Sequence, residues 1–222
     1  MAEKYNLHSE TPHVKRIYEI ADQIKQGHVA LFPTDSQYAL GCAYDNKKGI
    51  ERIRQIRQLE QKRHLTLMLD SLSHISKFAY LSDENFKIIK RLIPGPFTFI
   101  LPATKEVPKL LVHPSKETIG VRVPDYPITE KLIKEIGNPM LAITAKKKEI
   151  PDEEIKEMDR DTLLRHFEKQ VDLIIDDKRE NNRNESTVID MTNNHAVILR
   201  RGLRVEDAEE VFDLNGVAYE NA

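Results

Sequence analysis

Short apolar runs alternate with amphipathic helical patterns along the whole chain, and this alternation limits the fold more than any other feature of the sequence. From His13 to Gln26 the apolar residues fall on one helical face, and Gly27 follows as a residue type that commonly ends a helix. Residues 29–32 form a short apolar run that stops at Pro33, which is typical of a buried strand entering a loop. The alternation therefore predicts an α/β fold.

The rest of the chain follows the same pattern. Helical spacing predicts helices over residues 47–59, 82–93, 128–136 and 205–212. Short apolar runs predict strands over residues 65–69, 97–101, 118–123, 141–144, 171–175, 187–191 and 196–199, and residues 34–46 read as a loop. Because the expected strands outnumber the helices, we expect a mixed open sheet with flanking helices rather than a purely parallel one.

One charged segment interrupts the alternation. Lys146 to Lys169 carries 8 acidic and 7 basic residues in 24 positions. Its few apolar anchors are Ile155, Leu163, Leu164 and Phe167. We interpret residues 146–169 as an exposed helical excursion, either a solvated charged face or a segment with a function of its own. No break in composition marks a second domain, so a single domain over residues 1–222 is expected.

Charge and cysteine content exclude several classes of protein. The 34 Lys and Arg residues against 36 Asp and Glu residues argue against a protein that coats nucleic acid with a basic surface. No apolar run approaches the roughly 18 residues of a membrane span, and Met1 to Glu10 lacks the apolar stretch of a signal peptide. The single Cys42 excludes an internal disulfide and a multi-cysteine zinc site. We expect a cytoplasmic protein.

The spacing of glycine and histidine excludes two common kinds of site. The eight glycines are never closer than eight positions, so the chain has no glycine-rich phosphate loop. The histidines include no pair at i, i+4, and we infer no transition-metal site built by the protein. Cys42 lies in the apolar stretch 40–43, where a buried thiol is expected rather than a nucleophile.

Five short motifs place polar or cationic residues near expected strand ends, where open α/β sheets bind their ligands. Their residues are Pro-Thr-Asp-Ser at 33–36 with Tyr-Ala-Leu-Gly at 38–41, Pro-Gly-Pro-Phe-Thr at 94–98, Gly-Val-Arg-Val-Pro at 120–124, Ser-Thr-Val-Ile-Asp at 186–190 and Leu-Arg-Arg-Gly at 199–202. Each motif alone has an ordinary structural reading as a turn, a helix cap or a solvated arginine.

Together, in this order, the motifs resemble those of the YrdC/YciO family of threonylcarbamoyl-AMP synthases, over roughly Thr11 to Leu203. The family patterns read approximately PTDTVYGLG, KxR, PGPxT, GxRxP, SxSxN, STVVD and LRxG, and the first, third, fourth, sixth and seventh are present or nearly so. The resemblance implies a twisted mixed α/β sheet around a large, positively lined cavity. It also implies binding of ATP, L-threonine and bicarbonate, and formation of threonylcarbamoyl-AMP for the t6A modification of tRNA.

The implied chemistry suits the residues present. Threonine carbamate would attack the ATP α-phosphate and expel pyrophosphate, which needs positioning and charge stabilisation, with Mg²⁺ on the phosphates, rather than a covalent nucleophile. Arg122 and Arg200 offer planar forks matched to phosphate or carboxylate oxygens. By resemblance, Thr34 and Ser186 offer hydroxyls to threonine or phosphate. Thr98 and the Pro94 turn would shape the cavity wall.

The helix after the first motif adds a further expected contact. Arg57 falls where the family has the Lys of KxR, so the resemblance implies that Arg57 contacts the triphosphate. It also implies a catalytic role for Arg57 and for Arg122. Leu59 replaces the Arg of KxR, and Ala142, Thr144 and Lys146 stand at SxSxN. Thr144 keeps a hydroxyl and Lys146 brings a cation to the substrate site. These departures resemble the YciO branch, and we expect synthase turnover to be weak compared with nucleotide binding.

Two other functions remain open at this stage. An RNA-binding module for tRNA or double-stranded RNA would use the five basic residues between Glu51 and Arg63, where only two residues are acidic, and the lysines at 146–148. Against it, aromatic residues are 6% of the chain and Trp is missing, so stacking platforms are scarce. A hydrolase acting on threonylcarbamoyl adenosine species would need the same cavity as the synthase.

Overall fold

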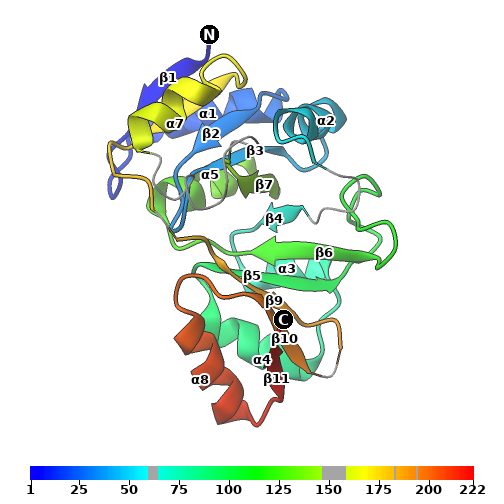
Figure 1. The fold of residues 1–222 in the computed structure, drawn as a ribbon. Helices are drawn as coiled ribbons and strands as arrows, with labels where there is room; N and C mark the ends of the chain where they lie inside the picture. The colour runs from blue at the N-terminus through cyan, green and yellow to red at the C-terminus, as the bar shows by residue number, and fades with distance from the viewer. Residues whose placement is uncertain (60–64, 147–158, 183, 194) are drawn as a thin grey trace. The chain divides into compact units, whose positions relative to one another are not determined.

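The computed structural model describes residues 1–222 except 60–64, 147–158, 183 and 194. The chain divides into two compact units (Figure 1). Unit 1 comprises Met1–Glu60 and Tyr126–Asn184, and unit 2 comprises Gln61–Asp125 and Glu185–Ala222. Each unit therefore combines two separate stretches of the chain. The single domain over residues 1–222 stays a prediction.

Unit 1 carries a mixed sheet in the order β1-β8-β2-β3-β7. The strands are β1 (Glu3–Asn6), β8 (Leu173–Asp176), β2 (Ala30–Phe32), β3 (Ala39–Ala43) and β7 (Met140–Thr144). β8 runs parallel to β1 and β2, whereas β3 is antiparallel to β2 and β7. The described helices of the unit are α1 (Val14–Lys25), α2 (Lys47–Ile56), α5 (Pro127–Ile136) and α7 (Arg160–Phe167). Helix α1 buries its apolar face and packs against α5.

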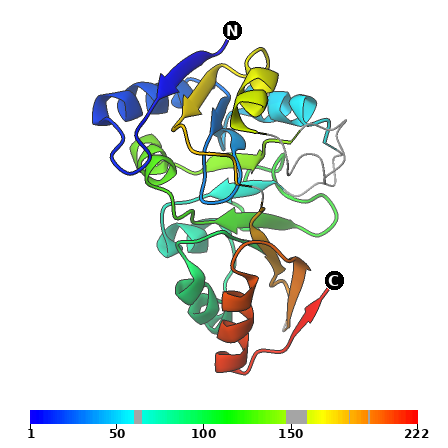
Figure 2. The same cartoon turned by 60° about the vertical axis from the view of Figure 1, so that its left-hand side comes forward.

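Unit 2 carries strands in the order β4-β6-β5-β9-β10-β11. They are β4 (Thr66–Met68), β6 (Thr118–Arg122), β5 (Phe97–Pro102), β9 (Thr187–Asp190), β10 (Ala196–Arg200) and β11 (Tyr219–Asn221). β5 is antiparallel to β6 and parallel to β9, and β10 is antiparallel to β9. The helices are α3 (Leu72–Phe78), α4 (Asp83–Leu92) and α8 (Val205–Asn215), with α4 and α8 side by side in both views (Figures 1 and 2). The expectation of a mixed rather than a parallel sheet is confirmed.

Most predicted elements are present, with one clear correction at a helix end. Gly27, which follows the C-cap residue Gln26 of α1, has a φ of +102°, as expected for a residue that ends a helix. The predicted helix over 47–59 is too long, because α2 ends at Ile56. Beyond it Gln58 takes a left-handed φ of 46°, and the Leu59 amide donates to the Arg54 carbonyl at 2.9 Å. These contacts turn the chain away from the helix axis.

Four of the described elements were not predicted: β1, β3, α3 and β11. Residues 39–43 were read as loop, yet β3 is a fully buried strand. Its small side chains give little strand signal of their own, and the strand exists because it pairs with β2 on one side and β7 on the other. β1 and β11 are short, largely polar strands, and β1 pairs with β8 while β11 pairs with β10.

The predicted charged excursion is described only in part. Residues 147–158, with Ile155, lie outside the described residues. Residues 160–167 form α7, in which Leu163, Leu164 and Phe167 are buried. The expected apolar anchors of this helix are therefore confirmed.

Candidate functional site

A tight loop between β2 and β3 carries the first motif. We call residues 33–38 the Thr34 loop. The Thr34 hydroxyl donates to the Gln37 carbonyl at 2.7 Å and accepts from the Ser36 amide at 3.1 Å. The Ser36 hydroxyl lies 3.2 Å from the same oxygen, and both side chains are buried. Because the single hydroxyl proton of Thr34 is directed to Gln37 and the Ser36 amide occupies one lone pair, Thr34 can meet a ligand in this conformation only as an acceptor, through the lone pair that is released when the Ser36 hydroxyl turns its proton away.

The remaining predicted residues of unit 1 lie around the end of β7. Thr144 is the last residue of β7 and pairs with Ala39 of β3. Arg57, just beyond the end of α2, donates from Nη1 to the backbone carbonyl of Lys146. Unit 1 thus brings Arg57, Thr144 and Lys146 to the end of β7. Ala142, which stands at the first position of the family pattern SxSxN, is buried on the same strand.

In unit 2, Ser186 is the centre of a second cluster. Its hydroxyl lies 3.2 Å from the Thr98 hydroxyl and accepts from Arg200 Nη2 at 3.0 Å. Arg200 Nε also donates to the Ser186 carbonyl at 2.9 Å, and Nη1 forms an ion pair of 3.1 Å with Glu185. We call Thr98, Glu185, Ser186 and Arg200 the Ser186 cluster. Three of its four residues were predicted as members of one site, and the structure brings these three together.

Sheet pairing explains why residues so far apart in sequence meet here. Thr98 lies at the start of β5, Ser186 directly precedes β9, and Arg200 ends β10. β5 is parallel to β9 and β10 is antiparallel to it, so these positions fall at one end of the sheet. Arg122 ends the neighbouring β6 and is 5% exposed. The amide of Gly95, in the Pro-Gly-Pro turn, donates to the carbonyl of Val123 at 2.9 Å, which joins that turn to the arginine motif.

Gly202 lets the last motif approach Ser186. A Cβ added at this glycine would lie 2.4 Å from the Glu185 carbonyl oxygen and 2.5 Å from the Ser186 carbonyl oxygen. The Gly202 amide donates to the Thr187 hydroxyl at 3.1 Å, and that hydroxyl donates to the Leu203 carbonyl at 2.9 Å. The glycine of Leu-Arg-Arg-Gly is thus required for a close contact between backbones.

The two sets of residues have different chemical capacities. The guanidinium of Arg200 and the Ser186 hydroxyl it supports are hydrogen-bond donors, which suit phosphate oxygens. The Thr34 loop offers an acceptor, which suits an N–H or O–H group. Cys42 is fully buried, and burial raises the pKa of its thiol to about 12, so it is a neutral thiol rather than a nucleophile near pH 7. The expectation of a buried thiol is confirmed.

Sequence reasoning missed Glu185, the ion-pair partner of Arg200. The only available signal was its position directly before the Ser-Thr-Val-Ile-Asp motif. Part of the predicted basic RNA surface is engaged within unit 1, because Arg52 forms an ion pair of 2.6 Å with Asp172. Lys62, Arg63, Lys147 and Lys148 lie outside the described residues.

Among residues 1–222 without the gaps given above, no group of three or more His, Cys, Asp or Glu side chains could hold a metal ion. No described helix is both long enough and apolar enough to pass through a bilayer.

Comparison with known proteins identifies relatives over nearly the whole chain. Residues 22–202 match the model of the Sua5/YciO/YrdC family, which carries the description "Telomere recombination". The uncharacterized protein YciO of Escherichia coli K12 is 37% identical over 203 residues, which are 91% of this chain and 97% of that protein. The threonylcarbamoyl-AMP synthase of Vibrio vulnificus YJ016 is 30% identical over 135 residues, which are 60% of this chain and 72% of that protein.

Solved structures show the same fold. The crystal structure of E. coli YciO matches with a TM-score of 0.81 at 36% identity, over 91% of this chain and 97% of that one. P. abyssi Sua5 complexed with L-threonine matches with a TM-score of 0.83 at 27% identity, over 98% of this chain and 62% of that longer one. The twisted mixed sheet with flanking helices is common to these structures, and this chain belongs to the Sua5/YciO/YrdC family.

Proposed function

We propose that this protein binds ATP and L-threonine and forms threonylcarbamoyl-AMP from them and bicarbonate, with weak turnover, for the t6A modification of tRNA. The observation that carries the proposal is the Ser186 cluster, in which Arg200 donates two hydrogen bonds to Ser186 and leaves the proton of the serine hydroxyl available as a donor. Synthase relatives and the threonine complex of P. abyssi Sua5 support the choice of substrates.

The donors of unit 2 suit the nucleotide. Arg200, held by its bonds to Ser186, and Arg122, at the end of β6, would offer guanidinium donors to phosphate oxygens, and Ser186 adds a neutral donor beside Thr98. In our proposal Thr98 and the Pro94 turn form the wall of this site. A negative phosphate bound here would share Arg200 with the Glu185 carboxylate.

The acceptor of unit 1 suits the amino acid. The nitrogen of threonine carries N–H groups both as an ammonium and as a carbamate, and its side-chain hydroxyl can also donate. Thr34, whose own proton is directed to Gln37, matches such donors better than it matches a phosphate oxygen. We therefore place threonine at the Thr34 loop, with Thr144 and Lys146 as further contacts.

The reaction needs no covalent intermediate with the protein. Threonine and bicarbonate give the carbamate with loss of water. A carbamate oxygen then forms a bond to the α-phosphorus while the bond to pyrophosphate breaks. Arginine forks at the developing charge lower the barrier by electrostatic stabilisation. Mg²⁺ would come with the ATP phosphates, because it commonly binds through phosphates and one or two carboxylates rather than a protein cage.

Three departures from the family patterns lead us to propose slow chemistry. Leu59 stands where the family has Arg, and Ala142 and Lys146 stand where it has Ser and Asn. An aliphatic side chain cannot replace a phosphate ligand, and Lys146 is a point charge without the fixed geometry of an amide. Losing one transition-state donor typically costs about 10²-fold in rate.

The test is mass spectrometry of a reaction containing ATP, Mg²⁺, threonine and bicarbonate, with each component omitted in turn. We expect threonylcarbamoyl-AMP only in the complete mixture. A protein that binds ATP but never yields this product, or that instead consumes added threonylcarbamoyl adenosine species, would contradict the proposal.

The rate is tested separately with the triple variant Leu59→Arg, Ala142→Ser, Lys146→Asn. At saturating ATP its threonine- and bicarbonate-dependent release of pyrophosphate should exceed that of the wild type by about 10²-fold. Brisk turnover by the wild type, without acceleration in the variant, would show an ordinary synthase.

A further inference from the structure

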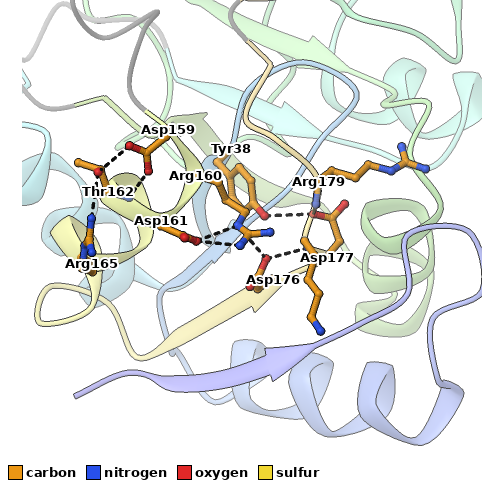
Figure 3. A network of polar contacts seen from close by, with 10 residues as sticks. Tyr38, Asp159, Arg160, Asp161, Thr162, Arg165, Asp176, Asp177 and Arg179 are labelled. Carbon is orange, nitrogen blue, oxygen red and sulfur yellow. Dashed lines mark hydrogen bonds and ion pairs between the residues drawn. The ribbon is translucent and has the colours of Figure 1, made fainter.

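A buried carboxylate that the proposed reaction does not use lies directly after β8. Asp177 is 8% exposed and accepts hydrogen bonds from the Tyr38 hydroxyl at 3.1 Å, the Tyr126 hydroxyl and the Arg179 amide at 3.1 Å. Figure 3 shows the Tyr38 hydroxyl directed at this carboxylate. Two phenols thus converge on one carboxylate from different parts of unit 1.

Tyr38 is the last residue of the Thr34 loop, and its backbone is also held. Its amide donates to the Asn181 side chain at 3.3 Å, and its carbonyl accepts from the Ala145 amide at 2.8 Å. Asn181 lies four residues after Asp177, and Ala145 lies between Thr144 and Lys146. Tyr38 therefore connects the loop to the segment after β8 and to the end of β7.

Helix α5 and the segment after β8 hold the two ends of the Thr34 loop. At the first end, the fully buried Thr129 donates from its hydroxyl to the Pro33 carbonyl at 2.7 Å. At the second end, Tyr38 reaches the helix through Asp177, which it shares with Tyr126, the residue that caps α5. A loop fixed at both ends keeps its geometry before a ligand arrives.

The surroundings of Asp177 favour this arrangement. Burial, and then the negative charge of Asp177, raise the pKa of Tyr38 well above its usual range. Burial and the hydrogen bond to Asp177 do the same for the pKa of Tyr126. Both phenols therefore stay protonated and donate. The guanidinium of Arg179 lies 5.3 Å from the centre of the Tyr126 ring, and Arg160 lies 3.7 Å from Asp176 (Figure 3).

We propose that Asp177 is a positioning residue which, through the Tyr38 hydroxyl, fixes the Thr34 loop so that Thr34 is presented as an acceptor to the amino-acid substrate. The part concerning the substrate rests on the proposed function. Asp177 acts only through Tyr38 and is not itself in contact with substrate. The local bonds of Thr34 to Ser36 and Gln37 define the shape of the loop, and the Asp177 contact defines where the loop is anchored.

The test compares Tyr38→Phe with Tyr126→Phe. Each change removes one hydroxyl from the same carboxylate, but only Tyr38 belongs to the loop, so the second variant is a matched control. Two quantities are measured: amide hydrogen exchange of residues 34–38, and the separate affinities for threonine and ATP by calorimetry.

In Tyr38→Phe we expect the loop amides to exchange about tenfold faster and threonine affinity to fall by about tenfold, the loss typical of one well-placed hydrogen bond. The affinity for ATP should change less than twofold. In Tyr126→Phe the loop exchange and the threonine affinity should stay within about threefold of wild type. Asp177→Asn keeps an acceptor for Tyr38, so it should retain more threonine affinity than Asp177→Ala.

Equal effects of the two phenylalanine variants on threonine affinity, with unchanged exchange of the loop, would overturn the inference and leave a purely structural network. If the wild type binds no threonine, the proposed function fails. The exchange measurement then still decides whether Asp177 anchors the loop. If Asp177→Ala does not fold, Tyr38→Phe decides alone.

Discussion

The Thr34 loop of unit 1 and the Ser186 cluster of unit 2 both present a buried hydroxyl, but with opposite hydrogen-bonding polarity. Thr34 gives its proton to the Gln37 carbonyl and accepts from the Ser36 amide, so one lone pair is left as an acceptor when the Ser36 hydroxyl turns away. Ser186 receives a hydrogen bond from Arg200, so its own proton is available to Thr98 or to a ligand. The comparison shows that neighbours, rather than the hydroxyl itself, decide which ligand group such a side chain can meet.

The two regions also differ in how they are built. The bonds of Thr34 reach residues two and three positions along the chain. The contact between Thr98 and Ser186 joins residues 88 positions apart, and Arg200 is 14 positions from Ser186. The loop is therefore mostly a local structure, whereas the cluster depends on the correct pairing of β5, β9 and β10.

This difference predicts that Gly202→Ala will have the largest effect, because it separates the backbones that the cluster needs. The added Cβ would lie 2.4 Å from the Glu185 carbonyl oxygen. We expect a loss of about 3 kcal/mol in the free energy of unfolding, at the upper end for overpacking, and strongly weakened ATP binding. Calorimetry and chemical denaturation measure both.

Gly216→Ala is the control for that change. Gly216 also lies in unit 2 and has a left-handed φ of 65°, but nothing lies within 4 Å of an added Cβ. It should cost only about 1 kcal/mol for the backbone conformation. Equal losses in the two variants would show that close approach at Gly202 is unimportant.

Arg200 and its neighbour Arg201 should contribute differently to ATP binding. Arg200→Ala and Arg122→Ala should each weaken ATP binding by about 1 to 3 kcal/mol, the value of a charge-assisted hydrogen bond. Arg201→Ala is the control, because that side chain is paired with Glu209 at 2.5 Å on the surface. Threonine affinity should not change. Unchanged ATP affinity in both the Arg122 and the Arg200 variants, measured by calorimetry, would remove unit 2 from the nucleotide site.

Substitutions of Thr34 test whether the hydrogen-bonding polarity of its hydroxyl selects the ligand. Thr34→Val removes the acceptor and should lower threonine affinity by about 1.4 kcal/mol, or roughly tenfold, while Thr34→Ser keeps the hydroxyl and should restore most of it. Titrations with threonine and with ATP distinguish the ligands. A larger loss for ATP than for threonine would reverse the assignment of ligands to the two regions.

Glu185→Gln should have a smaller effect, in the opposite direction. The change removes the carboxylate that pairs with Arg200 at 3.1 Å and so leaves the guanidinium more available to phosphate. We expect ATP to bind about threefold more tightly, since partly exposed ion pairs are worth up to about 1 kcal/mol. Glu209→Gln, which breaks the pair with Arg201, should leave ATP affinity unchanged. Weaker binding in Glu185→Gln would mean that Glu185 supports Arg200 rather than competing for it.

Cys42→Ala should have the smallest effect on function. Its thiol is buried against Gly49, and burial raises the pKa to about 12, so no thiolate is available near pH 7. Pyrophosphate release should stay within about twofold of wild type, with a packing loss of about 1 kcal/mol. A hundredfold loss of activity with an intact fold would require a thiol in the mechanism.

The sequence alone predicted the alternation of elements, most helices and strands within a few residues, and the motifs that identify the family. These features depend on side-chain periodicity and on residues close together in the chain, such as Gly27 after α1. It did not predict β3, because Ala, Gly and Cys have little preference for strands. That strand is stabilised by β2 and β7, and its Gly41 lies against the ring of Phe32.

For the candidate site, the sequence determined which hydroxyls and cations are present, namely Thr34, Ser186 and Arg200, and their order along the chain. Only the tertiary structure decided their neighbours: Glu185 beside Arg200, and Asp177 beneath Tyr38. The bond from Tyr38 to Asp177 joins residues 139 positions apart. Bonds over such separations exist only after sheet pairing has brought the segments together, so neither hydrogen-bonding polarity nor anchoring could be derived from local sequence.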